Sequence, residues 1–118
     1  MARKQNTPEG EWIPVHQEID GNILTPEKYQ GQQLIIKGST YIVISDNADE
    51  GIIKTNGPKI DIYGTDGINK GRHLTAIYRI AAGKLTICYD LTGTHYPKTF
   101  STIGQTSYFL AIFKKATI

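Results

Sequence analysis

Apolar residues recur at every second position on either side of the short connection Ala81-Ala82-Gly83. They share one face of each flanking segment: Leu74, Ala76, Tyr78 and Ile80 in the first, and Leu85, Ile87 and Tyr89 in the second. A period of two is that of a strand with one face against a core, and a short connection containing Gly suits a hairpin. The pattern therefore predicts a β-hairpin, 73–80 with 84–89, near the middle of the chain.

The rest of the chain continues this pattern and contains no long amphipathic helix. Six further short strands are expected at Gly10–Ile19, Gln33–Lys37, Thr40–Ser45, Gly51–Thr55, Lys59–Tyr63 and Ser107–Lys114. Eight short strands joined mostly by short connections favour an antiparallel up-and-down barrel, because closing the sheet removes its exposed edges. The interior of such a barrel is either filled by side chains or holds one small ligand.

Several segments interrupt the alternation. Pro14 cannot donate a ladder hydrogen bond, so it marks an edge, a bend or a bulge, and the face presented beyond it is left open. Residues 25–29 read as a short helical turn, with Thr25 at the N-cap and Pro26 at the first helical position. Asp46–Glu50 and Gly64–Gly71 read as polar loops. Residues 1–9 are expected to form a flexible arm before a single barrel domain, 10–118.

Composition narrows the class of protein. The chain has 118 residues, 39% of them hydrophobic and 20% charged, with a formal net charge of +2. These values fit one soluble globular domain, and the charge is too small and too dispersed for a nucleic-acid-binding surface. The basic pairs Arg3-Lys4 and Lys114-Lys115 read as solvated ends. No apolar run approaches the roughly 20 residues that span a bilayer, and no secretion signal is visible, so a cytoplasmic location is expected.

A set of short motifs resembles a family of lipocalin-like domains, mostly uncharacterised, that is numerous in planctomycete-type bacteria. The order and spacing of the motifs carry the resemblance from Gly10 to about Lys114: Gly10-x-Trp12, Glu18-x-Asp20-Gly21, Pro58-Lys59-Ile60-Asp61-Ile62, Asp66-Gly67, Lys70-Gly71, Ala76-Ile77-Tyr78, Leu85-Thr86-Ile87-Cys88-Tyr89 and Pro97-x-x-Phe100. The resemblance implies a lipocalin-like antiparallel barrel and no established activity. Many relatives carry a secretion signal, which implies that some are secreted.

In lipocalins proper, a Gly-x-Trp on the first strand packs at the closed end of the barrel, under a basic residue from the end of the last strand. Trp12 matches that motif. The resemblance implies that Lys114 or Lys115 supplies the basic partner through a cation–π contact. This role is structural.

The residues that carry catalytic or metal chemistry elsewhere do not form a recognisable pattern here. Cys88, Asp90 and His95 lie close in sequence, but without a nucleophile elbow the cysteine reads as a buried hydrophobe. The three histidines are too widely spaced for a metal motif, and His16 is the candidate if one inward histidine were to ligate a haem. No catalytic residue, metal or cofactor is therefore expected.

Glu18 and Asp61 are the strand acids considered for a cavity. If Ile60 and Ile62 point inward, Asp61 points outward into solvent. An acid–base pair of these two carboxylates is therefore not favoured.

Tyrosines supply the candidate ligand-binding residues. Four of the seven fall on the predicted inward face of separate strands: Tyr41, Tyr78, Tyr89 and Tyr108. Rings of this kind can hydrogen-bond the polar end of a ligand while aliphatic residues bury the rest, or they can simply fill the core. The expected function is non-enzymatic binding of a small apolar or amphipathic molecule. The alternative is a structural or protein-interaction barrel with a filled core. The apolar last strand also predicts a second buried face, covered by a helical lid or by a second copy in a homodimer.

Overall fold

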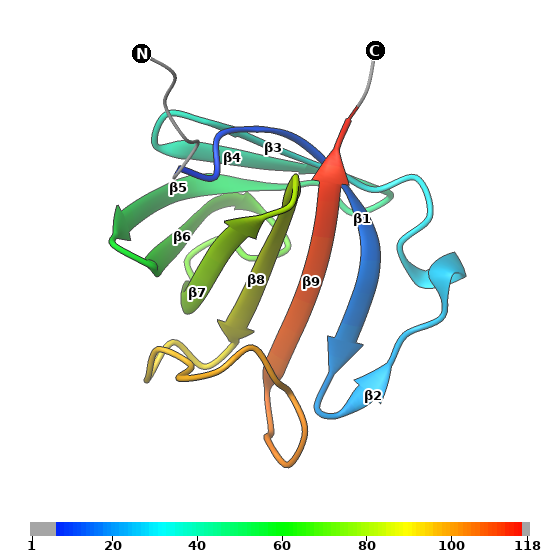
Figure 1. Ribbon diagram of the computed structural model, residues 1–118. Helices are drawn as coiled ribbons and strands as arrows, with labels where there is room; N and C mark the ends of the chain where they lie inside the picture. Colours follow the sequence, from blue (N-terminus) through cyan, green and yellow to red (C-terminus); the bar gives the residue numbers. More distant parts are fainter. Residues whose placement is uncertain (1–6, 117–118) are drawn as a thin grey trace, which may run out of the picture.

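One antiparallel sheet closes on itself in the computed structural model, which describes residues 7–116 (Figure 1). Its strands are β1 (Gly10–Ile19), β2 (Asn22–Ile23), β3 (Gln33–Lys37), β4 (Thr40–Ile44), β5 (Asp49–Asn56), β6 (Lys59–Gly67), β7 (His73–Ala81), β8 (Lys84–Asp90) and β9 (Tyr108–Lys115). The strand order is β2-β1-β3-β4-β5-β6-β7-β8-β9, and pairing of β1 with β9 closes the barrel. The predicted eight-stranded up-and-down barrel is confirmed, with β2 as an additional short strand and a 3-10 turn at Pro26–Lys28.

A β-bulge in β1 decides which face that strand presents. Trp12 and Pro14 are buried inside the barrel, and the register with β9 then shifts between Pro14 and His16. The shift reverses the alternation, so that Gln17 faces inward and His16 faces outward. The candidacy of His16 as an inward haem ligand is therefore wrong, and the physical reason is the bulge beside Pro14.

β5 and β6 extend furthest beyond the strands that the sequence pattern predicts. β5 begins at Asp49 rather than at Gly51, and β6 continues to Gly67 through part of the expected 64–71 loop. The register between β5 and β6 shifts where Glu50 pairs with Asp66 and Gly51 with Gly64, which leaves Thr65 as the bulged residue of β6. Because of this extension, Asp49 lies on the inward face of a strand and not in a loop.

The end of the barrel at Trp12 is closed by packed side chains. The Trp12 ring is fully buried, its Nε1 donates to the Pro8 carbonyl at 2.9 Å, and Lys115 Nζ lies 4.8 Å from the ring centroid. The predicted contact between Trp12 and a basic residue of the last strand is thus present, with Lys115 as the partner. Three two-residue turns lie at the same end, at residues 38–39, 57–58 and 82–83.

The chain before β1 is partly fixed to this closed end. Pro8 is buried, and the Glu9 carboxylate accepts a 2.7 Å hydrogen bond from the Gly38 amide. The sequence predicts a flexible arm over 1–9; within it, Pro8 and Glu9 contact the closed end of the barrel. Residues 1–6, including Arg3 and Lys4, lie outside the described part of the chain.

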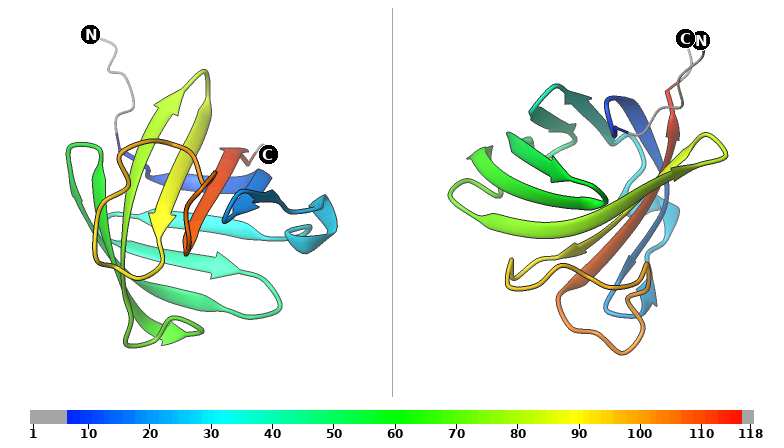
Figure 2. Two further views of the ribbon diagram at one scale, coloured as in Figure 1. Left: turned by 90° about the horizontal axis from the view of Figure 1, so that it is seen from below. Right: turned by 60° about the vertical axis from the view of Figure 1, so that its left-hand side comes forward.

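The outer face of β7, β8 and β9 carries a second, smaller apolar cluster. It contains Ile77, Cys88 and Leu110, with Tyr96, Phe100, Tyr108 and Ile112 packed against them. The loop 91–107 provides two of these side chains and lies beside the ends of β8 and β9 (Figures 1 and 2). The sequence predicts a second buried face on the last strand, covered by a helical lid or by a second copy. The face is buried, and the structure shows a loop of the same chain packed on it.

Candidate functional site

A cavity of about 370 Å³ occupies the barrel interior and reaches the end opposite Trp12. Its walls are mostly aliphatic and aromatic: Leu34, Ile36, Val43, Ile53, Ile60, Ile62, Leu74, Ile87, Leu91, Phe109 and Phe113. Its polar lining comes from Gln17, Gln32, Gln33, Tyr41, Ser45, Asn47, Asp49, Asn69 and Tyr89. An apolar chamber with a few converging polar groups, in this size range, is typical of a small-molecule site.

A hydrogen-bonded cluster around Asp49 forms the polar part of the cavity. The Tyr41 hydroxyl lies 3.4 Å from Asp49 Oδ1 and 3.3 Å from Oδ2. Asn69 donates two hydrogen bonds to the same carboxylate, from its side-chain Nδ2 to Oδ2 at 2.9 Å and from its backbone N–H to Oδ1 at 3.4 Å. Asp49 is 7% exposed. Burial, followed by the adjacent Asp49 charge, raises the pKa of Tyr41 well above its ordinary value, so Tyr41 remains a neutral donor.

Glycines permit this cluster to form. Gly51 lies opposite Tyr41 in the β4–β5 pairing, and a Cβ there would lie 2.8 Å from Tyr41 Cε1 and clash with the Tyr63 carbonyl. A Cβ at Gly64 would clash with the backbone of Asn69 in the same way. The absent side chains let the Tyr41 ring lie over β5 and let the turn after β6 bring Asn69 to Asp49.

Tyr89 lies on the opposite wall and completes the polar end. Its ring packs on Phe109, with centroids 5.6 Å apart. Its hydroxyl has no hydrogen-bond partner among residues 7–116. Burial, then the proximity of Tyr41 and Asp49, raises its pKa, so this hydroxyl also stays neutral.

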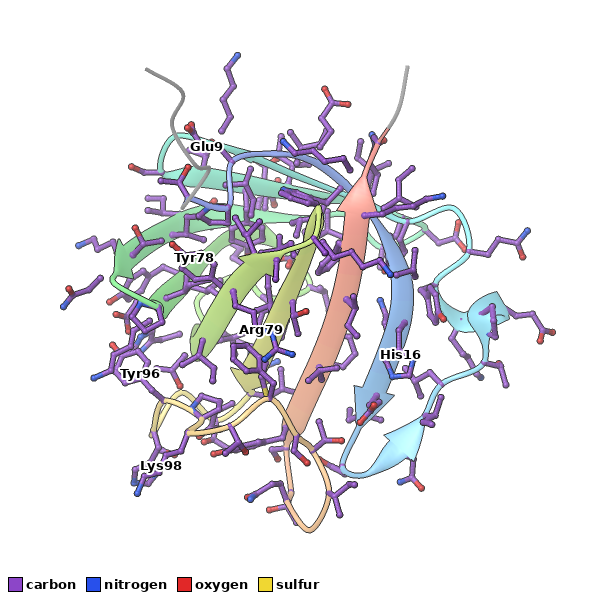
Figure 3. All side chains as sticks on the ribbon, in the orientation of Figure 1. Glu9, His16, Tyr78, Arg79, Tyr96 and Lys98 are labelled. Carbon is purple, nitrogen blue, oxygen red and sulfur yellow. The ribbon has the colours of Figure 1, made fainter. Side chains whose placement is uncertain are left out.

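The four tyrosines predicted to contact a ligand occupy three different environments. Tyr41 and Tyr89 line the cavity. Tyr78, which is labelled in Figure 3, belongs to β7 and is packed into the inner apolar cluster. It is not among the residues that line the cavity. Tyr108 packs in the outer cluster with Leu110, so its predicted inward orientation is wrong.

The two strand acids singled out from the sequence both lie outside the cavity. Glu18 accepts from Thr102 Oγ1 at 3.0 Å and lies 2.7 Å from His16 Nε2. Asp61 accepts from the Tyr96 hydroxyl at 2.6 Å and lies 2.8 Å from His73 Nε2, and it thereby fastens the loop to β6. Desolvation raises the pKa of Asp61, but the Tyr96 and His73 contacts outweigh it and leave the pKa lowered.

Cys88 has the surroundings of a packing residue. It is fully buried in the outer cluster, and burial raises the pKa of its thiol to about 11, against the direction that a reactive thiolate requires. Asp90 holds the start of the loop by accepting hydrogen bonds from Thr92, Thr94 and the His95 amide. Within residues 7–116 no three His, Cys, Asp or Glu side chains gather as a metal site would need. Over the same residues, no helix combines the length and apolar character that crossing a membrane requires.

Sequence reasoning missed Asp49 and Asn69 because both were assigned to loops. One signal for Asp49 was available: Asp49, Gly51 and Ile53 share the inward alternation of β5. Extending that period by two residues before Gly51 places the Asp49 carboxylate inside the barrel. Asn69 carries no comparable signal, because it reaches the cavity from a turn.

A search with the sequence found no matching protein-family model and no matching curated protein.

Proposed function

We propose that this chain is a lipocalin-like, non-enzymatic binding protein that holds one small apolar or amphipathic molecule inside its barrel. The observation that carries the proposal is the cavity itself: apolar walls, with polar groups gathered at the end away from Trp12. Burying a ligand tail against those walls contributes roughly 25 cal/mol per Å² of apolar surface. The lipocalin-like assignment is supported by the eight-stranded barrel and by the Trp12–Lys115 contact at its closed end.

Titration with a neutral apolar dye, N-phenyl-1-naphthylamine, tests the proposal. We expect a saturable rise in fluorescence with about one site per chain. Neighbouring positions on β4 offer a matched pair of variants, because Val43 lines the cavity and Ile42 faces outward and is exposed. Val43→Trp should fill the space and weaken dye binding at least about tenfold, whereas Ile42→Trp should leave it unchanged.

Two results would contradict the proposal: no saturable binding by the native protein, or equal loss of binding in both variants. Native mass spectrometry of gently purified protein supplies a second readout, since a retained ligand adds a discrete mass.

The alternative function is a protein-interaction barrel. The observation that favours it is the group of exposed isoleucines on the outer faces of β4 and β5, Ile42, Ile44 and Ile52. Under this alternative the native protein shows no saturable dye binding.

A further inference from the structure

Asp49 brings a negative charge into the cavity without a positive partner. Within residues 7–116 the cavity lining includes no Lys, Arg or His, and Asp49 makes no ion pair. Its donors, Tyr41 and Asn69, are neutral groups. A buried charge is costly unless it is paired as well as hydrogen-bonded. No positive side chain among the described residues compensates the charge of Asp49.

The groups around Asp49 suit a cation entering the cavity. Tyr41 lies on one side, and Tyr89 faces the same polar end with a hydroxyl that is free to accept a hydrogen bond. Two neutral phenol oxygens and a carboxylate provide acceptors for an ammonium group, whose three N–H bonds all donate. The low dielectric of an apolar chamber strengthens the attraction between the two charges.

The rest of the cavity offers no comparable site for charge. Its other walls are mainly isoleucine, leucine, valine and phenylalanine. A ligand that satisfies both parts therefore has one cationic head and one apolar tail. An anionic head, such as that of a fatty acid, would meet the Asp49 charge with repulsion and would find no cationic side chain among the described lining residues.

We propose that the cavity binds a small amphipathic amine, with its protonated amino group on Asp49 between Tyr41 and Tyr89 and its hydrocarbon tail along the apolar wall. This inference rests on the proposed ligand-binding function and specifies its ligand class. It assigns Asp49 as the residue that determines head-group specificity.

Three probes that share one tail test the head group directly: octylammonium, octanol and octanoate, titrated calorimetrically into the native protein at pH 7. Octylammonium should bind about tenfold or more tightly than octanol, because a charge-assisted hydrogen bond is stronger than a neutral one, and octanoate should bind weakest. Asp49→Asn should bring octylammonium and octanol to within about twofold of each other. Tyr89→Phe should weaken octylammonium binding by a smaller factor.

Asp61→Asn is the matched control, since it removes a carboxylate from the outer face of the same barrel wall and should leave the order of the three probes unchanged. Dye binding by Asp49→Asn verifies that its cavity is intact. The inference is overturned if octanol or octanoate binds as tightly as octylammonium, or if Asp49→Asn keeps the native preference, in which case Asp49 serves only to hold Asn69. The proposed function remains if octanol and the dye still bind, whereas failure of all three probes and of the dye overturns both proposals.

Discussion

The two ends of the barrel are built in opposite ways. At the closed end, Trp12 is fully buried under Lys115, and three two-residue turns join the strands. At the other end the connections between strands are longer, and the barrel interior contains the cavity that Asp49 lines. The same alternating strands therefore supply a packed core at one end and a lined chamber at the other.

Tyr78 and Tyr89 show this difference on a single hairpin. Both point inward, from β7 and β8, yet Tyr78 is 8% exposed within the inner cluster, whereas Tyr89 borders the cavity. Two tyrosines on the same face of the sheet thus have different surroundings, according to how far each lies from the closed end. We expect the closed end to determine stability and the open end to determine binding.

The largest expected effect is on the free energy of unfolding of Tyr78→Ala. Loss of a packed aromatic ring should reduce it by about 3–5 kcal/mol. Tyr89→Ala should cost only about 1–2 kcal/mol, because its ring packs on Phe109 on one side but borders the cavity on the other, and it should impair dye binding. Urea denaturation of both variants measures the difference. Equal losses of stability would end the distinction between the two positions.

Gly51→Ala should damage both properties. The new Cβ meets the Tyr63 carbonyl and the Tyr41 ring, so we expect a loss of about 1–3 kcal/mol together with weaker dye binding. Ile52→Ala alters the next residue on the outer face and serves as the control, with a smaller loss and native dye binding. If Gly51→Ala kept native dye binding, Tyr41 would not depend on the bare backbone of β5 for its position.

Acid should weaken the loop that joins β8 to β9 through Asp90. Desolvation raises the pKa of Asp90, but hydrogen bonds from Thr92, Thr94 and His95 leave it below the ordinary value of 3.8. A pKa lowered in the folded state contributes stability above the unfolded value, and this contribution disappears as the pH falls through the folded one. Urea midpoints should therefore fall from about pH 5 to pH 3, and less steeply in Asp90→Asn. A variant with the native slope would show that Asp90 does not contribute.

The smallest effects are expected for the two lysines at the end of β9, Lys115 and Lys114. Removing the ammonium group over Trp12 in Lys115→Met should cost about 1 kcal/mol or less, since the lysine is exposed and the methionine keeps part of the packing. Lys114→Met, one residue earlier and with no described ring contact, should cost less still. Thermal unfolding followed through Trp12 fluorescence compares the two. A larger loss of stability in Lys114→Met than in Lys115→Met would show that the cation–π contact does not stabilise the closed end.

Alternation alone predicts much of this fold because most strands bury one face. The β7–β8 hairpin, the inward position of Tyr41 and the outward position of Cys88 all follow from a period of two. A period of two cannot be read in a run that is apolar at every position, such as 108–113 in β9. The barrel covers one face of β9 and loop 91–107 covers the other, so the pattern does not reveal that Tyr108 lies on the outer face.

The candidate site was less predictable than the barrel. The bulge in β1 reverses the face that His16 presents, and the polar sequence 46–50 predicts a loop where β5 begins with Asp49. Asn69 reaches Asp49 only through the folded turn after β6, a tertiary contact without a local pattern. Strand alternation thus predicts much of the apolar wall of the cavity. The position of Asp49 within the cavity is known only from the three-dimensional structure.

The pairing of β1 with β9 has a consequence for how the molecule folds. Trp12 lies opposite Lys115, so the final seam of the barrel joins segments separated by nearly the whole sequence. Every other pair of barrel strands except β1–β3 and β8–β9 is joined by a short connection. Closing so long a loop costs chain entropy that only the finished seam repays. We therefore expect the β7–β8 hairpin to form early and the seam to form after the rate-limiting step, so that Leu110→Ala in β9 accelerates unfolding more than it slows refolding in stopped-flow measurements. The opposite partition would place the seam in the folding nucleus.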